Sequence, residues 1–441
     1  MSATLTAHRR RFVVLTALRW LPTGVVVPVL VLLLSQRGLS LATIGLLTAV
    51  HSATTFVLEL PTGGLSDVVG RRPVLLLAAM MGGVSALVLA LATTPALLMV
   101  GAVLMGASRA LDSGPLQAWY VDGVHAVDAH ADLTTGMSRA GVAESASLAV
   151  GALAAGAVVA VAPLPTSGSL VVALSVPFLI KAALTVPQVV AVAVWVRDEA
   201  QPDAISRADA PAHASARVSV GARARASARD VPATVMRGLR LARSRATIRR
   251  LLLLSGALGV ALAGIELLAP AHAAALLGGE SAAAGPYSVL VTAGFLGSAA
   301  GSSLAPLAAT LARRDSRAAA LGIAGAALAL VGVAAPIAGV AAACFVAFYL
   351  MLGIAAPLTD VLLHREATSR ERATVLSLQS MALQAAAVVA TAALGVLTGV
   401  TSLLVGFTVI AAVLATGALT LVRWPAAKPA AASAQGTATV S

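Results

Sequence analysis

Charged residues are scarce in this chain: they make up 11% of its 441 residues, against about 25% in an average soluble domain. Hydrophobic residues make up 59%, and the mean hydropathy is +0.93. Such a composition excludes an ordinary water-soluble globular protein, because most of the apolar surface needs lipid as its solvent. Length and apolar content allow about a dozen membrane-spanning helices of roughly 20 residues each.

Cysteine and aromatic residues are rare as well. The single cysteine, Cys344, excludes a disulfide within the chain. Aromatic residues make up only 3%, which leaves little for base stacking, so we expect no nucleic-acid partner despite a net charge of +12. The catalytic patterns HExxH and GxSxG and phosphate-binding glycine loops are all missing. We therefore expect a protein that is not an enzyme and that needs no metal ion or cofactor.

What the chain does have is twelve long apolar segments, six on each side of a hydrophilic stretch. Each is long enough to cross a bilayer as a helix, in which the backbone satisfies its own hydrogen bonds. The fold class predicted is an all-α polytopic membrane protein. Its predicted parts are a first half (residues 1–196), a central loop (197–250), a second half (251–423) and a disordered tail (424–441).

The basic residues fall almost entirely on one side of these segments. Of 30 basic residues, 26 lie at the N-terminus, at the C-terminus or in loops on the same side, and 12 of those are arginines of the central loop. Only Arg37 lies on the other side. Positive residues accumulate in cytoplasmic loops, so both termini are predicted to be cytoplasmic, in a multi-pass protein of the cell membrane.

The central loop has two regions of different composition. Up to about Asp230 it is rich in Ala, Ser, Arg, Asp and Pro, which is typical of a flexible linker. From Val231 to Arg250, apolar residues recur near helical spacing with arginines between them. This part is predicted either to form an amphipathic helix on anionic lipids or to be an arginine-rich tether. We expect the protein to be monomeric in the bilayer.

The most specific motif is the loop from Gly64 to Pro73, between the second and third spans. It carries one acid, Asp67, with Gly64, Gly70 and the arginines Arg71 and Arg72. Its spelling and position resemble the signature loop of the major facilitator superfamily. The residues just before it, from Glu59 to Gly63, and those from Arg109 to Gly114 in the fourth span resemble bacterial drug-efflux members. The resemblance implies twelve helices in two six-helix halves. It also implies a conformational latch, in which this loop pairs with Asp122 at the inner end of the fourth span.

The second half has a weaker copy of this loop. It runs from Gly301 to Arg313 and Arg314, and it keeps the glycine and the arginines but lacks the acid. The sequence therefore predicts a degenerate counterpart at best.

Several ionisable residues lie inside the spans, where they are costly and usually face a cavity or a partner. In the family resembled, spans one, four, seven and ten line the central cavity. The candidates for proton or substrate binding are Arg19, Arg109, Asp112, Glu144 and Glu266.

Glu266 is the sharpest of these candidates, because no basic residue lies near it in the sequence. A carboxyl group there suits proton exchange or recognition of a cation; the alternative is a protonated acid bonded between helices. Arg109 and Asp112 are three residues apart on one helix and share a face. Arg109 therefore has two candidate partners, Asp112 and Glu144, and Ser113-Gly114-Pro115 is predicted to loosen the helix just beyond it.

These observations predict a secondary transporter that works by alternating access on a small-molecule substrate. Proton-coupled efflux of amphipathic or drug-like molecules is the leading hypothesis, on the resemblance to efflux members. The fifth span lacks the glycine-proline pair that is common in such exporters, and this difference weakens the efflux hypothesis. A proton-coupled sugar or nutrient symporter is the alternative, and a membrane sensor or embedded enzyme is a more distant one.

Overall fold

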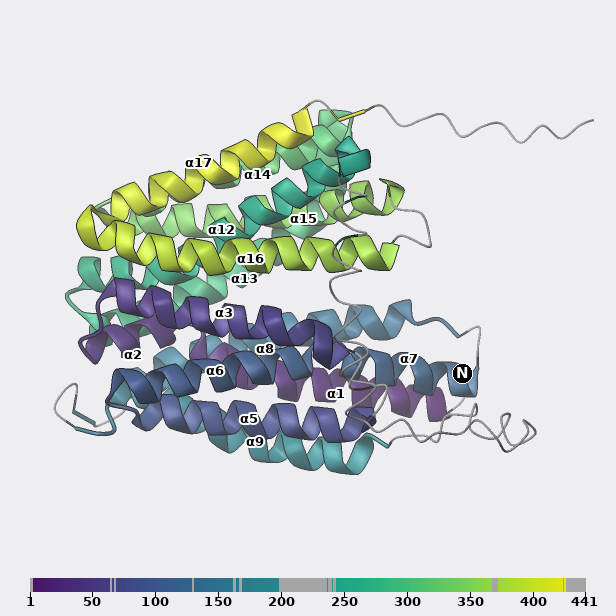
Figure 1. Cartoon of the computed structure of the whole chain (residues 1–441), viewed down its shortest axis with the longest axis horizontal. Coiled ribbons are helices and arrows are strands. Elements are labelled where there is room, and N and C mark those ends of the chain that lie inside the picture. Colours follow the sequence, from purple (N-terminus) through teal and green to yellow (C-terminus); the bar gives the residue numbers. More distant parts are fainter. Residues whose placement is uncertain are drawn as a thin grey trace, which may run out of the picture.

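The structure is a computed structural model that describes residues 3–63, 69–128, 131–161, 169–197, 243–366 and 372–422, with residues 66, 164–165, 236, 240 and 424–425. All regular secondary structure in these ranges is helical (Figure 1). Twelve helical segments are long and apolar enough to cross a membrane, which agrees with the twelve spans predicted. Half of residues 231–250, where an amphipathic helix is the predicted alternative to a tether, lies outside the described residues, and so does most of the tail.

The first half contains α1 to α9 and the second half α12 to α17. The elements of the first half are α1 (Ala3–Val26), α2 (Leu30–Gln36), α3 (Leu41–Gly63), α5 (Arg71–Leu91), α6 (Pro95–Asp112), α7 (Pro115–Val127), α8 (Thr134–Val161), the short 3-10 helix η1 (Ala173–Ser175) and α9 (Val176–Trp195). Those of the second half are α12 (Ala246–Leu277), α13 (Glu280–Ala312), α14 (Asp315–Val333), α15 (Ala338–Glu366), α16 (Arg372–Val400) and α17 (Leu403–Val422). The helix α12 thus begins five residues before the predicted boundary of the second half.

Two spans of the first half are interrupted. Gly114 separates α6 from α7 in a left-handed conformation (φ 98°), and Pro115 begins α7, as the Ser113-Gly114-Pro115 sequence predicts. The first span is also broken, between α1 and α2, next to Pro28. Pro28 cannot donate the helical hydrogen bond, which explains a break at this point. Backbone groups freed at such breaks can be tolerated in a membrane only where protein or water satisfies them.

The two halves come closest toward one end of the bundle. We call the end where α3 finishes and α5 begins the motif end, and the opposite end the far end (Figure 1). Across the halves α3 packs against α16, and α8 packs against α13. A Cβ atom added to Gly395 would lie 2.6 Å from the carbonyl oxygen of Leu41. The amide of Gln36 also donates to the hydroxyl of Ser281 across the halves (2.8 Å).

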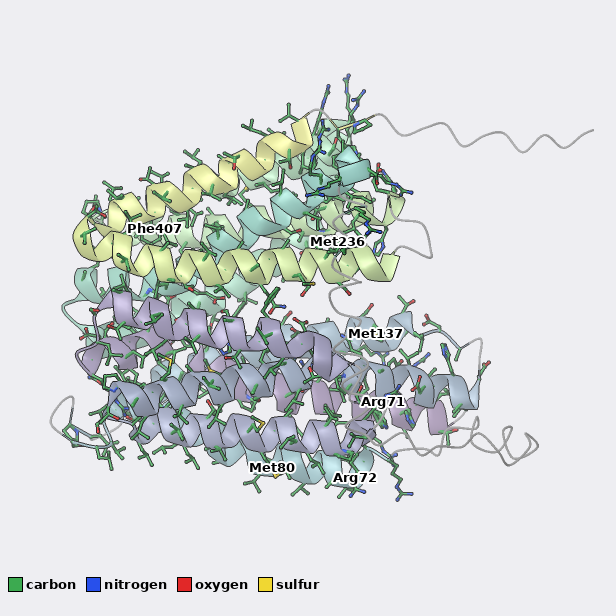
Figure 2. The ribbon with its side chains drawn as sticks, in the orientation of Figure 1. Arg71, Arg72, Met80, Met137, Met236 and Phe407 are labelled. Carbon is green, nitrogen blue, oxygen red and sulfur yellow. The ribbon has the colours of Figure 1, made fainter. Side chains whose placement is uncertain are left out.

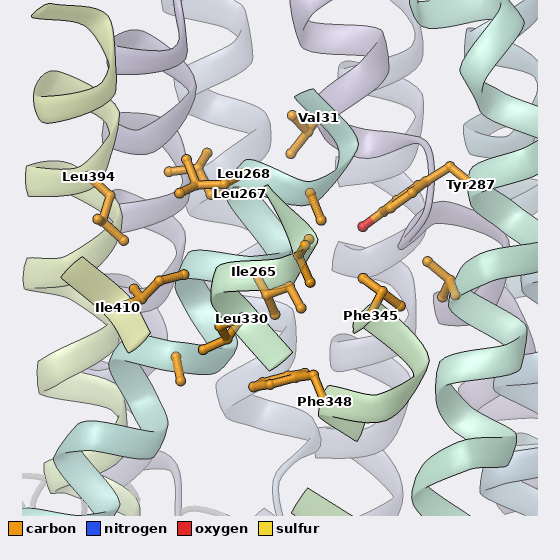
Figure 3. Packing of buried hydrophobic residues seen from close by; sticks show 14 of the residues in the cluster. Val31, Ile265, Leu267, Leu268, Tyr287, Leu330, Phe345, Phe348, Leu394 and Ile410 are labelled. Atoms are coloured by element: carbon orange, nitrogen blue, oxygen red, sulfur yellow. The ribbon is translucent and has the colours of Figure 1, made fainter. Parts of the chain in front are cut away.

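The core of the second half is built from branched aliphatic and aromatic side chains. Ile265, Leu330, Phe348 and Ile410 are fully buried and face one another between α12, α14, α15 and α17 (Figure 3). Small residues let these helices approach closely, as is usual in membrane bundles. This apolar core has no chemical groups for binding or coupling, so the candidates for function are the polar side chains that it holds in position.

Candidate functional site

A cluster of charged side chains lies where α1 and α6 meet. Arg19 on α1 donates to the carboxylate of Asp112 on α6 in an ion pair, and both side chains are mostly buried. Arg19 and Asp112 are separated by 93 residues, and the fold brings them together. Asp112 is therefore paired with Arg19, whereas the sequence had offered Arg109 as its partner.

Trp20 joins this cluster from α1. The guanidinium carbon of Arg109 lies 5.0 Å from the centre of its ring, and that of Arg19 lies 5.2 Å from it. Attraction between a cation and an aromatic face contributes about 0.5–2 kcal/mol, more where water is excluded. The ring thus lies against both arginines, and this attraction offsets part of the repulsion between the two guanidinium groups.

Glu266 reaches this cluster from the second half. Its side chain is exposed, although Leu267 and Leu268 next to it on α12 are buried at 1% and 0% exposure. It interacts electrostatically with Arg109, and also with Tyr287 and Tyr349 of α13 and α15. Glu266 is therefore an accessible acid within a membrane span, within electrostatic range of Arg109 in the first half.

Glu144 on α8 completes the set of candidates. It interacts electrostatically with both Arg19 and Arg109. The structure thus brings all five candidates into one neighbourhood: Arg19, Arg109, Asp112, Glu144 and Glu266. Among the residues that the structure describes, no group of three His, Cys, Asp or Glu side chains could hold a metal ion.

Two further residues form a polar contact between the halves that sequence reasoning missed. Glu59 on α3 accepts from the hydroxyl of Ser113 (3.2 Å) and from the amide of Gln384 on α16. Neither side chain is conspicuous in the sequence, because Glu59 lies near the end of its span and Gln384 is uncharged. Only the folded arrangement shows this pair, because 325 residues separate its members.

Lys181 on α9 also belongs near this cluster. It interacts electrostatically with Arg109 and Asp112. It lies between Pro177 and Pro187 on the sixth span of the first half. The sequence does mark Lys181 as unusual, because it is the only lysine within a predicted span.

The predicted latch is visible in part. Arg71, the first residue of α5, donates to the carboxylate of Asp122, and the two labelled arginines of the motif lie at the motif end (Figure 2). Gly70 has φ 100°, a conformation that favours glycine. Asp122 lies within α7, which continues to Val127. Gly64 and Asp67 lie outside the described residues.

The second half carries a matching ion pair with its signs exchanged. Asp315, the first residue of α14, accepts from Arg365 near the end of α15 (2.6 Å). Asp315 directly follows the loop copy that had been judged to lack an acid. The two pairs occupy corresponding places, since each joins the third span of a half to the end of the fourth.

The model of the Major Facilitator Superfamily matches residues 12–365 of the chain. The chain belongs to the major facilitator superfamily. It is therefore a multi-pass membrane transporter and not an enzyme. No curated protein sequence matches it significantly.

Solved structures of other members of this superfamily share the fold. The nucleoside transporter NupG superposes with a TM-score of 0.70 at 11% identity, covering 95% of this chain and 100% of that one. A bacterial homologue of the human lysosomal transporter Spinster, inward-facing and unoccupied, gives 0.67 at 13% identity, with 96% and 95% covered. The peptide transporter POT in complex with sulfate gives 0.64 at 16% identity, with 93% of both chains covered. At such identities the likeness concerns the fold.

Proposed function

We propose that this transporter works by alternating access and couples proton entry to the export of small amphipathic or drug-like molecules. The observation that carries the proposal is the interaction of Glu266 in the second half with Arg109 in the first. A proton or a cationic substrate that neutralises Glu266 removes its attraction for Arg109. Binding at this point therefore changes the energy with which the halves associate, which is what coupling requires.

The contacts at the far end indicate which conformation of the transport cycle this structure represents. Gly395 against Leu41, and Gln36 with Ser281, hold the halves together at the far end. The ion pairs Arg71–Asp122 and Asp315–Arg365 at the motif end each join elements of one half. With the motif end on the cytoplasmic side, as the arginine distribution favours, this state is inward-facing. The Spinster homologue that shares the fold was solved in an inward-facing state.

Orientation is tested by labelling in intact cells. In a Cys344→Ala background, Thr93→Cys places a thiol at an exposed position of the far end, and His125→Cys places one at an exposed position of the motif end. We expect a membrane-impermeant maleimide to label the first and not the second. The reverse pattern would invert the proposed topology.

Coupling is tested in inside-out vesicles with a panel of substrates that ranges from lipophilic cations to sugars. Accumulation of a substrate when the vesicle interior is acidified indicates antiport, hence export in the cell. Symport, the alternative, would give accumulation under the opposite gradient. Absence of any flux that depends on the gradient would defeat proton coupling.

The role of Glu266 is tested by Glu266→Gln, which keeps the size of the side chain and removes its charge. We expect the variant to lose gradient-driven accumulation. Asp360→Asn on α15 is a matched control, because Asp360 is an exposed acid near the motif end, with His364 as its electrostatic neighbour. Coupling that persists in Glu266→Gln would place the proton site elsewhere.

The latch proposal concerns Asp67 together with Arg71 and Asp122. Because Arg71 and Asp122 lie in the same half, their ion pair alone need not differ between the two states. Asp67→Asn is therefore the informative variant, with the populations of inward- and outward-facing molecules as the readout. If the two populations are unchanged in Asp67→Asn, the latch proposal is wrong.

A further inference from the structure

A large cavity lies at the motif end of the second half, away from the central charged cluster. Its volume is about 1110 Å³, and it lies among the motif-end termini of α12, α13, α14 and α15 and the segment that follows α17. Four arginines line it: Arg245, Arg313, Arg314 and Arg365. Such a concentration of positive charge in one hollow requires an explanation, because like charges repel.

The acids of the cavity are already engaged. Asp315 is paired with Arg365. The carboxylate of Glu366 accepts from the hydroxyl of Thr247 (2.8 Å), and its carbonyl oxygen accepts from Arg245 (3.3 Å). The lining therefore keeps an excess of positive charge.

Arg313 and Arg314 supply that excess. Both side chains are exposed, and neither has a carboxylate partner in the part of the chain that the structure describes. Arg313 directly follows α13 as its C-cap with φ 60°, and within the described ranges it is the only residue other than glycine with a positive φ. A side chain other than glycine is disfavoured in this conformation, and such outliers often mark functional sites.

The surroundings of the cavity are those of a membrane surface. On α13, Leu307 and Leu311 are 56% and 76% exposed, next to Thr310 and Ala309, which line the cavity. Exposed leucines near the end of a membrane-spanning helix offer an apolar surface that acyl chains can cover. Trp424 adds an amphipathic ring to the lining, a residue type enriched at membrane interfaces. A headgroup can therefore reach the arginines while its acyl chains lie along α13.

We propose that this cavity binds a phosphate group, either the headgroup of an anionic phospholipid or a soluble phosphate anion. Guanidinium groups match the oxygens of a phosphate in charge and in hydrogen-bonding geometry. Basic pockets between membrane helices are suited to such headgroups. Because the lining comes from the ends of four helices and from the segment that follows α17, an occupant ties these parts together within the second half. This site is independent of the transport site proposed above.

The test uses the purified full-length protein in a neutral detergent. Short-chain phosphatidylglycerol, short-chain phosphatidylcholine and inorganic pyrophosphate are titrated separately, and tryptophan fluorescence is recorded. Trp424→Phe assigns the signal, since Trp424 lines the cavity. We expect a saturable change with phosphatidylglycerol and none with phosphatidylcholine. A saturable change with pyrophosphate that competes with the lipid would identify soluble phosphate as a source, and a response to the lipid alone would identify the headgroup.

Two arginine variants probe the site directly. Each arginine near an anionic group contributes about fivefold in affinity, so Arg313→Gln with Arg314→Gln should weaken binding by about 20-fold or more. Arg314→Gln alone leaves the left-handed Arg313 in place and should weaken it about fivefold. Arg10→Gln with Arg11→Gln is the matched control, because it removes two exposed arginines from the motif end of the first half.

A thermal-shift measurement on the unaltered protein covers the case in which a variant does not fold. Phosphatidylglycerol or pyrophosphate should raise the melting temperature, and phosphatidylcholine should not. The proposal is overturned if neither anion gives a saturable response. It is also overturned if the Arg313/Arg314 double variant binds as tightly as the Arg10/Arg11 control.

Discussion

Gly395→Ala should shift this transporter away from the state in which the far end is closed. The Cβ atom would lie 2.6 Å from the carbonyl oxygen of Leu41 and 3.1 Å from the Cα atom of Ala42. Both neighbours are backbone atoms of the other half, so no side chain can move aside to relieve the overlap. To restore an ordinary contact, α3 and α16 must move apart by most of an ångström.

The cost follows from the behaviour of overpacked interiors. An extra methyl group in a well-packed contact typically costs about 1–3 kcal/mol. In an alternating transporter only the far-end-closed state bears this cost, since the other state separates the same helices. A difference of this size changes a two-state equilibrium by about 5- to 150-fold. Molecules with an open far end should therefore become a large fraction of the population.

Distances between spin labels measure that population. In a Cys344→Ala background, cysteines at the exposed positions Thr93 and Thr401 report on the far end of the two halves. A second pair at His125 and His364 reports on the motif end. We expect Gly395→Ala to lengthen the first distance and to shorten the second.

Two glycine variants separate this effect from a general loss of stability. Gly399 lies one turn further along α16, and a Cβ there would have no neighbour within 4 Å, so Gly399→Ala should change neither distance. A Cβ on Gly322 would lie 2.9 Å from the carbonyl oxygen of Met351, but both residues belong to the second half. Gly322→Ala should therefore lower stability without changing the populations. Distances in Gly395→Ala equal to those of the unaltered protein would refute the reasoning.

Three further predictions concern polar contacts. Asp122→Asn removes the ion pair with Arg71, and the Asp122 side chain is 60% exposed. A double-mutant cycle of the two residues, measured by thermal unfolding, should therefore give a coupling free energy below about 1 kcal/mol. A larger coupling would contradict a solvent-screened pair. Gln384→Leu leaves Glu59 without its hydrogen-bond donor from the other half. The distances between the spin labels should then shift in the same direction as in Gly395→Ala. Unchanged distances would show that this contact does not hold the halves together. At the start of α8, hydrogen bonds from Thr135 and from the backbone of Thr134 hold the pKa of Asp132 well below its usual range. A lowered pKa gives stability that is complete above about pH 4, the pKa of an unfolded aspartate, and that decreases at lower pH. The melting temperature should therefore fall in Asp132→Asn at pH 7, and its gap to the unaltered protein should narrow toward pH 3; a constant gap would exclude this role.

The sequence predicted the spans because their signal is local. Hydropathy along the chain is enough to find twelve apolar segments, and the dipeptide Gly114-Pro115 predicts a break in a helix from its own backbone chemistry. The break next to Pro28 was missed, since a proline near a span end is also compatible with a continuous helix. The charged candidates were found one at a time, because an ionisable residue in lipid is conspicuous. Their pairing was not predictable: Arg19 selects Asp112 only through the packing of α1 on α6.

The exchanged signs of the two motif-end ion pairs have a consequence for helix electrostatics. The N-terminus of a helix is partially positive and its C-terminus partially negative. Asp315 and Arg365 in the second half lie at the favourable ends, the acid at the start of α14 and the base in the last turn of α15. Arg71 in the first half is at the start of α5, where a cation is disfavoured. The first half thus keeps a cation where the helix field opposes it, at about 0.3–1 kcal/mol. Helix electrostatics alone would therefore favour the arrangement of the second half over that of the first.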